Sequence, residues 1–199
     1  IHWHKGDTRE AAILLKTYLP MFYLLTAIIS VFVSTHSKII TSILGGAAYD
    51  DAYLAVLIMS FMPLHQTYGQ LVGSAFYATD KTRLYRNLRL IFPFMGFPVT
   101  FIMISNVDHL GLNLGAAGYA FAGVFNQIVR VNIMLFYMCK ILDIKMKPFL
   151  YHQLYSVTIV YAIAISVKIL VAKIPLLTIN IYTNILSDGI MYMIMIGLI

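Results

Sequence analysis

Three polar side chains that could bind a charged ligand stand close together in an otherwise apolar stretch of this sequence. Asn126 and Gln127 precede Arg130 by four and three residues, so on a helix all three lie on one face. An arginine pairs its planar guanidinium with phosphate or carboxylate oxygens and keeps its proton. The group therefore predicts a site that contacts an anion. Snorkelling of Arg130 to the membrane surface, or a structural ion pair, is the alternative that the sequence leaves open.

A second polar face occurs in the apolar segment 52–78. Its members recur at intervals of three or four residues, and they are Ser60, Pro63, Gln66, Thr67, Gln70 and Ser74. His65 falls outside this face. A polar face in a lipid bilayer either forms hydrogen bonds to a neighbouring helix or lines a cavity that holds water. In the second case, Gln66 and Gln70 would bind substrate together with the Arg130 group.

The sequence lacks the residue patterns of common catalytic and metal sites. Its six histidines are scattered, with no HExxH motif and no pair at the spacing of metal ligands. The single cysteine, Cys139, excludes an intrachain disulfide and a CxxC motif. We therefore expect no catalytic residues, no metal and no cofactor, which disfavours an enzyme.

The composition is that of a membrane protein. Hydrophobic residues make up 60% of the 199 residues and charged residues 11%, whereas soluble domains have about 45–50% and about 25%. A membrane-spanning helix needs about 20 apolar residues. We therefore predict an all-α, polytopic transmembrane helix bundle of about six membrane segments, with no soluble domain. The predicted spans are approximately 18–38, 52–78, 84–105, 114–138 and 153–172, followed by a last helix from about 186.

Two features near the ends of the chain complete this prediction. Asn180, Asn184 and Asp188 recur every four residues, which we interpret as an amphipathic turn at the membrane surface. The chain starts at Ile1 rather than at a methionine, and its last apolar run continues to Ile199. We therefore expect the chain to be a fragment of a longer protein that is cut at both ends.

The distribution of cations predicts the orientation of the spans. In the stretch SAFYATDKTRLYRN, residues 74–87, a long apolar run ends and basic side chains follow closely. Ten of the 14 Lys and Arg residues lie in loops that would share one side of the membrane: Lys5, Arg9, Lys16, Lys81, Arg83, Arg86, Arg89, Lys140, Lys145 and Lys147. Lys38 and Lys173 lie on the other side. Because cytoplasmic loops are rich in Lys and Arg, the ten mark the cytoplasmic side, and nucleic acid is not an expected partner.

Four segments, in this order, resemble a family of transporters. They are KGDTREAAILLKTYLP, ILGGAAYDDAYLAVLIM, LVGSAFYATDKTRLYRN and GLNLGAAGYAFAGVFNQIV. The matching features are Gly6 and Asp7 before a helix with Pro20 near its start, the pattern Gly46, Tyr49 and Ala52, the turn from Ala78 to Thr82, and the Gly-x-x-x-Gly-Ala-Ala motif at Gly111 to Ala117. Across about residues 1–150, the chain is similar to the polysaccharide, or O-antigen type, flippases of the multidrug/oligosaccharidyl-lipid/polysaccharide (MOP) exporter superfamily.

The resemblance implies half of a two-lobed, MATE-like transporter with a central cavity that opens alternately to each side of the membrane. The implied substrate is undecaprenyl-diphosphate-linked oligosaccharide, flipped across the bacterial cytoplasmic (inner) membrane for surface polysaccharide and lipopolysaccharide biosynthesis. The implied partners are this lipid-linked substrate, membrane lipids and the missing N-terminal half of the same chain. Two alternatives stay open. One is a multidrug exporter of the same superfamily, which predicts more acidic residues in its cavity, and the other is a polytopic membrane enzyme of polysaccharide assembly, such as a polymerase or acyltransferase.

Overall fold

The computed structural model describes residues 8–173 and 181–197, which form helices joined by turns, with no strand in either range. The helices are α1 (Thr8–Thr35), α2 (Ser37–Gly45), α3 (Tyr53–Met59), α4 (Met62–Ala78), α5 (Thr82–Ile104), α6 (Gly115–Ile141), α7 (Lys147–Ala172) and α8 (Ile181–Gly197), with short 3-10 helices η1 (Ala47–Ala52) and η2 (Val107–His109). Four of these helices, α1, α5, α6 and α7, are long and apolar enough to cross a membrane. The all-α class is confirmed for the described residues, and the number of about six spans stays a prediction.

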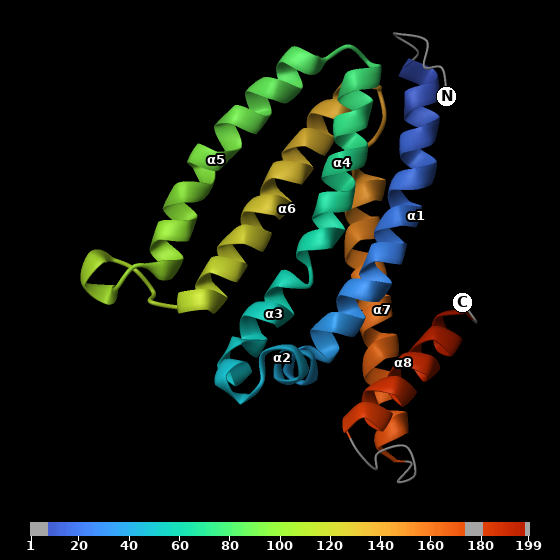
Figure 1. The fold of residues 1–199 in the computed structure, drawn as a ribbon. Coiled ribbons are helices and arrows are strands. Elements are labelled where there is room, and N and C mark those ends of the chain that lie inside the picture. The colour runs from blue at the N-terminus through green and yellow to red at the C-terminus, as the bar shows by residue number, and fades with distance from the viewer. Residues whose placement is uncertain (1–7, 174–180, 198–199) are drawn as a thin grey trace.

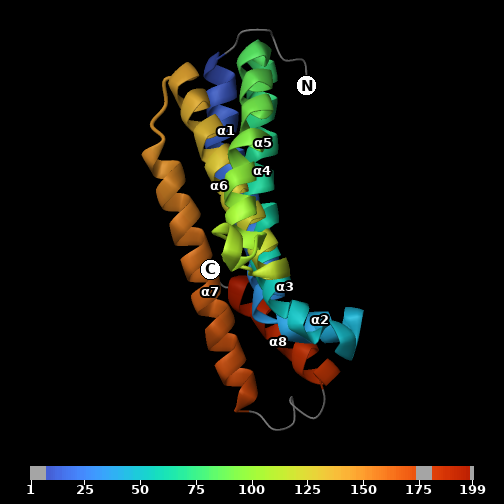
Figure 2. The same cartoon turned by 90° about the vertical axis from the view of Figure 1, so that its left-hand side faces the viewer.

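Neighbouring long helices pack in the order α5, α6, α4, α1 and α7, and α8 packs on α7 (Figure 1). The turns that carry most of the cations lie at one end of this arrangement. The start of α1, the α4–α5 turn and the α6–α7 turn lie there, whereas α2 and the α5–α6 turn lie towards the opposite end (Figures 1 and 2). This arrangement agrees with the predicted grouping of the basic loops on one side of a membrane.

The first span differs from its predicted limits of 18–38. α1 already begins at Thr8, and it ends at Thr35, where the chain turns into α2. No glycine or proline stands at this break. Instead, the Thr35 hydroxyl and the His36 ring each lie 3.0 Å from the Phe32 carbonyl oxygen. Side chains that bond to the backbone of their own helix compete with its regular hydrogen bonds, which gives a physical reason for the break.

The segment 52–78, predicted as one span, is divided. Ala52 is the last residue of η1, α3 ends at Met59 and α4 begins at Met62. The cause is Pro63 in the first turn of α4, because a proline has no amide hydrogen and its ring clashes with the carbonyl four residues earlier, that of Met59. The polar face therefore does not extend along one continuous helix from its predicted start.

The later spans agree more closely with prediction. α5 and α6 begin within two residues of the predicted starts at 84 and 114, and Pro93 and Pro98 lie inside α5 without ending it. α7 begins at Lys147 instead of about 153, with a proline in its first turn. α8 begins at Ile181, before the predicted start at about 186. The ends differ because polar and mixed residues also extend a helix once tertiary packing supports it.

The core between α1 and α4 is built around aromatic rings. Tyr23 is only 1% exposed, and its ring meets that of Tyr68 edge-on at 4.8 Å between centroids and the His65 ring at 5.9 Å. His65 was predicted to fall outside the polar face of its helix, and it is buried in this core. Gln66 and Gln70 are exposed on the other face of α4. Packing of the aromatic face thus turns the glutamine face towards α5 and α6.

Candidate functional site

Two adjoining pockets lie where α4, α5 and α6 come together. The first, with a volume of about 230 Å³, is the arginine pocket, and its lining includes Gln66, Gln70, Tyr85, Arg89, Gln127 and Arg130. The second, of about 370 Å³, is the aromatic pocket, and its lining includes Phe92, Phe97, Thr100, Asn126, Gln127 and Arg130. Gln127 and Arg130 line both pockets, so the two form one continuous candidate site.

The structure brings all five predicted site residues to these pockets. Gln66, Gln70, Gln127 and Arg130 line the arginine pocket, and Asn126 lines the aromatic pocket. They come from α4 and α6, which are separated in sequence by the whole of α5. Their placement follows the predicted faces, and their role in binding a substrate stays a prediction.

The two glutamines of α4 face a cavity rather than a helix partner. Within residues 8–173 and 181–197, neither the Gln66 nor the Gln70 side chain donates or accepts a hydrogen bond with another helix. Thr67, on the edge of the same face, does form such a contact, with its hydroxyl 3.2 Å from that of Thr26 in α1. The helix-contact alternative therefore applies to Thr67, and the cavity alternative applies to Gln66 and Gln70.

The Arg130 guanidinium belongs to the middle of α6 and is half-buried. The helix continues for eleven residues beyond it, to Ile141, which is roughly 16 Å by the rise of an α-helix. Its Nη2 donates a hydrogen bond to Oε1 of Gln127, a side chain that is 4% exposed. In the part of the chain that the structure describes, no carboxylate forms an ion pair with Arg130. The contact of Arg130 with an anion therefore stays a prediction.

Arg89 and Tyr85 line the arginine pocket, and reasoning from the sequence did not place them there. Arg89 was interpreted only as one of the cations that mark the cytoplasmic side. Its guanidinium lies over the Tyr85 ring, 5.6 Å from the centroid, at the range of a cation–π contact. Tyr85 in turn stacks on Phe76 of α4, with 5.4 Å between centroids. The spacing of four between Tyr85 and Arg89 on one helix was the signal that could have linked them.

Two glycines of α4 allow the neighbouring helices to approach. A Cβ atom at Gly73 would lie 2.7 Å from the Tyr85 hydroxyl oxygen, and one at Gly69 would lie 3.2 Å from a methyl group of Val131 in α6. A larger side chain at position 73 would displace the Tyr85 ring and with it the Arg89 guanidinium. The two glycines therefore allow Tyr85 of α5 and Val131 of α6 to lie close to α4.

Asn126 connects α6 to α5. Its Nδ2 donates to the carbonyl of Gly96 at 3.3 Å, and a Cβ atom at Gly96 would lie 2.9 Å from that same nitrogen. The amide is thus engaged with the backbone of the neighbouring helix. This contact holds the two walls of the aromatic pocket together, whether or not Asn126 also contacts a substrate.

The site carries two guanidinium groups, and no Asp or Glu is among the residues that line either pocket. The glutamine amides add neutral hydrogen-bond donors, and the phenylalanines add apolar surface next to the charge. Among residues 8–173 and 181–197, no three His, Cys, Asp or Glu side chains come together as metal ligands would. The chemistry of the lining fits an anion that also has an apolar part.

Comparison of the chain with models of known protein families, with curated proteins and with solved structures found no match in any of the three. The membership in the MOP superfamily that the sequence suggests therefore stays an expectation. The function proposed for the site rests on its geometry and on that resemblance.

Proposed function

We propose that the chain belongs to a membrane transporter that flips undecaprenyl-diphosphate-linked oligosaccharide across the bacterial cytoplasmic membrane for surface polysaccharide biosynthesis. The observation that carries the proposal is the arginine pocket, in which Arg89 and Arg130 line one cavity between three helices. A diphosphate presents two adjacent anionic groups, and each can accept paired hydrogen bonds from a guanidinium. The resemblance to MOP flippases supplies the lipid carrier and the sugar.

The position of the pocket supports transport across a membrane. Arg89 and Arg130 belong to α5 and α6, two of the four helices apolar enough to span a bilayer. A charged side chain as far along a spanning helix as Arg130 is stable only when it faces protein, water or a ligand. A charged headgroup could cross through this cavity while its lipid tail remains among membrane lipids. In a MATE-like architecture, the pocket would face the second lobe and open alternately to each side.

The lining also separates the proposal from export of cationic drugs. Such an exporter is expected to place carboxylates in its cavity, and both pockets here are lined without any Asp or Glu. Phe92 and Phe97 line the aromatic pocket together with the shared Arg130. Charged and apolar surfaces in contact are what an amphiphile with a phosphate headgroup requires.

Binding of undecaprenyl diphosphate to the intact protein in lipid nanodiscs tests the site. Arg130→Gln and Arg89→Gln each remove one charged hydrogen-bonding group, worth about 1.5–3 kcal/mol, so Kd should rise about 10–150-fold. Arg83→Gln is the matched control, because it removes the same charge from the exposed start of α5, outside both pockets. Undecaprenol, which has no phosphate, should bind all four proteins equally. Equal affinities of the four proteins for the diphosphate would contradict the proposed site.

Transport is measured separately from binding. Proteoliposomes that contain the intact protein and a fluorescent lipid-linked oligosaccharide should move this substrate between leaflets without changing it chemically. The Arg130→Gln and Arg89→Gln variants should lose this activity, and Arg83→Gln should retain it. Binding by the wild-type protein without any movement between leaflets would rule out the flippase, and a chemically altered lipid product would indicate an enzyme instead.

A further inference from the structure

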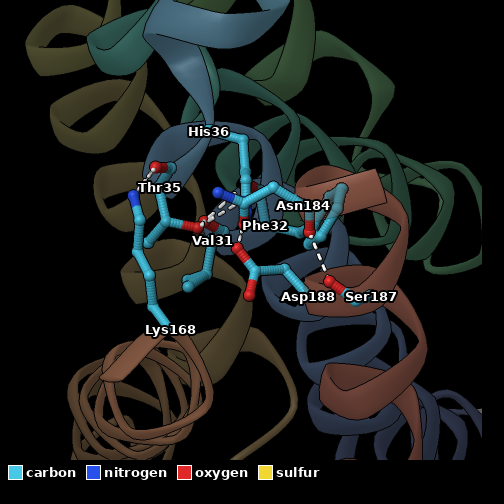
Figure 3. A network of polar contacts seen from close by, with 8 residues as sticks. All are labelled: Val31, Phe32, Thr35, His36, Lys168, Asn184, Ser187 and Asp188. Carbon is cyan, nitrogen blue, oxygen red and sulfur yellow. Dashed lines mark hydrogen bonds and ion pairs between the residues drawn. The ribbon is translucent and has the colours of Figure 1, made fainter. Parts of the chain in front are cut away.

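His36 and Asp188 form a buried pair away from the arginine pocket (Figure 3). Nε2 of His36 lies 3.0 Å from Oδ2 of Asp188, and the two residues are 5% and 3% exposed. The pair joins the break between α1 and α2 to α8, across 152 residues of sequence. The interpretation of Asp188 as part of an amphipathic turn at the membrane surface is therefore wrong, because tertiary packing buries its carboxyl group. Asn180, from the same predicted turn, lies outside the described residues.

The two ring nitrogens of His36 each face a hydrogen-bond acceptor, so two N–H or O–H hydrogens are needed for both contacts. A neutral imidazole and an ionised carboxylate together supply only one. Nδ1 lies 3.0 Å from the carbonyl oxygen of Phe32, which can only accept a hydrogen bond. Nε2 faces the Asp188 carboxyl group, which in its ionised form also only accepts. A neutral imidazole has a single N–H, so one of these contacts would join two acceptors. One further proton, on the ring or on the carboxyl group, makes both contacts hydrogen bonds.

A hydrogen bond from the Thr35 hydroxyl to the His36 ring does not remove the need for this proton. Its oxygen lies 3.1 Å from Nδ1 of His36, but also 3.0 Å from the carbonyl oxygens of Val31 and Phe32. A hydroxyl has one hydrogen, which can serve only one of these acceptors at a time. If it turned to Nδ1, that nitrogen would still face the Phe32 carbonyl as a second acceptor at 3.0 Å. The unfavourable contact would remain.

The second carboxyl oxygen of Asp188 also favours a bound proton. Oδ1 is buried and has no hydrogen-bond partner among residues 8–173 and 181–197. A buried charged oxygen without a partner is far more costly than a neutral one. The ammonium of Lys168 on α7 donates to the Thr35 carbonyl at 2.8 Å, on the side of the pair away from Asp188 (Figure 3). No hydrogen bond or ion pair connects it to the carboxyl group in the described structure.

The other titratable side chains near the pair have contacts of their own. Tyr192 of α8 donates to a main-chain carbonyl of α1 at 2.9 Å, and the Tyr161 hydroxyl of α7 lies 3.2 Å from that of Ser34. The Lys38 ammonium at the start of α2 lies 4.7 Å from the ring centroid of Tyr53. Within the described ranges, the carboxyl group of Asp188 therefore has the His36 ring as its one ionisable partner.

We propose that His36 and Asp188 together bind one proton, which holds α8 against the break between α1 and α2. With the proton bound, Nδ1 donates to the Phe32 carbonyl and the second proton lies between Nε2 and Oδ2. After release of the proton, one of these contacts brings two hydrogen-bond acceptors together in a buried site. This unfavourable contact favours separation of α8 from the break between α1 and α2, and entry of water. The site is a different part of the bundle from the arginine pocket, so it does not depend on which ligand that pocket takes.

Hydrogen–deuterium exchange of the intact protein in nanodiscs between pH 5 and pH 9 tests the proposal. After correction for the intrinsic pH dependence of exchange, α8 should be protected at low pH and lose protection as the proton is released. Asp188→Asn places an amide donor opposite Nε2, so a neutral His36 ring can make both contacts and α8 should keep its protection at high pH. Asp108→Asn, in the exposed η2, is the matched control and should keep the wild-type profile.

Three results would overturn the proposal. The first is equal protection of α8 in the wild-type protein at every pH, which decides the matter even if Asp188→Asn does not fold. The second is an Asp188→Asn profile with the pH dependence of the wild type. The third is recovery of protection at high pH when sodium chloride replaces choline chloride, because a bound cation would then take the place assigned to the proton. None of these measurements involves diphosphate binding, so they are independent of the proposed transport function.

Discussion

Replacement of Gly118 by alanine should separate α5 from α6. A Cβ atom at Gly118 would lie 2.6 Å from the carbonyl oxygen of Met103 in α5, which is 0.8 Å inside the 3.4 Å at which ordinary van der Waals contact begins. This oxygen belongs to the main chain and already accepts a hydrogen bond from the Leu114 amide at 3.0 Å. It cannot rotate away as a side chain would, so the helices themselves must move.

Gly123 offers a matched control on the same helix, because a Cβ atom there would meet nothing within 4 Å. Both substitutions gain about 0.5–1 kcal/mol of helix propensity, which cancels when the variants are compared. Overpacking of a close contact costs about 1–3 kcal/mol. The free energy of unfolding of Gly118→Ala should therefore be lower than that of Gly123→Ala by about 1–3 kcal/mol.

Cys139 provides the assay. It is the single cysteine of the sequence and is 3% exposed, so a maleimide dye should react with it only when the bundle opens. On heating, Gly118→Ala should unfold about 2–12 °C below Gly123→Ala, at about 2–4 °C per kcal/mol. Because α5 carries Arg89, Gly118→Ala should also bind undecaprenyl diphosphate more weakly. Identical unfolding temperatures of the two variants would refute the close approach of α5 and α6 at this glycine.

Two further predictions concern packing and topology. Asn132→Leu removes the side chain whose oxygen accepts from Gln153 at 3.0 Å, and it should cost about 1–2 kcal/mol in the same dye assay. The double variant Asn132→Leu/Gln153→Leu should recover part of this loss, since neither polar group is left unpaired, and a purely additive loss would contradict the contact. Cysteines introduced at Thr82 and Asp108 should react with an impermeant maleimide from opposite sides of the membrane, and labelling of both from one side would contradict the topology.

Several features of the fold could be predicted because they depend on local spacing. An apolar run of sufficient length forms a membrane helix wherever it lies, so α5 and α6 begin close to their predicted positions. The break before α4 also has a local cause, Pro63. From the sequence, Pro63 is placed on the polar face, but its interruption of the helix is not predicted. The break at His36 has no comparable signal, because hydroxyl and imidazole contacts to the helix backbone depend on side-chain conformation.

By itself, the sequence determined that the chain is helical and apolar and that Asn126, Gln127 and Arg130 share one helix face, because positions three or four apart coincide on any α-helix. Only the tertiary structure decided that Arg89 shares a pocket with Arg130 and that His36 lies against Asp188. Both relations join different helices, and they depend on which helices are neighbours and how each is rotated about its axis. The aromatic and glycine contacts that set this rotation act together in three dimensions, so no single segment of sequence carries the information.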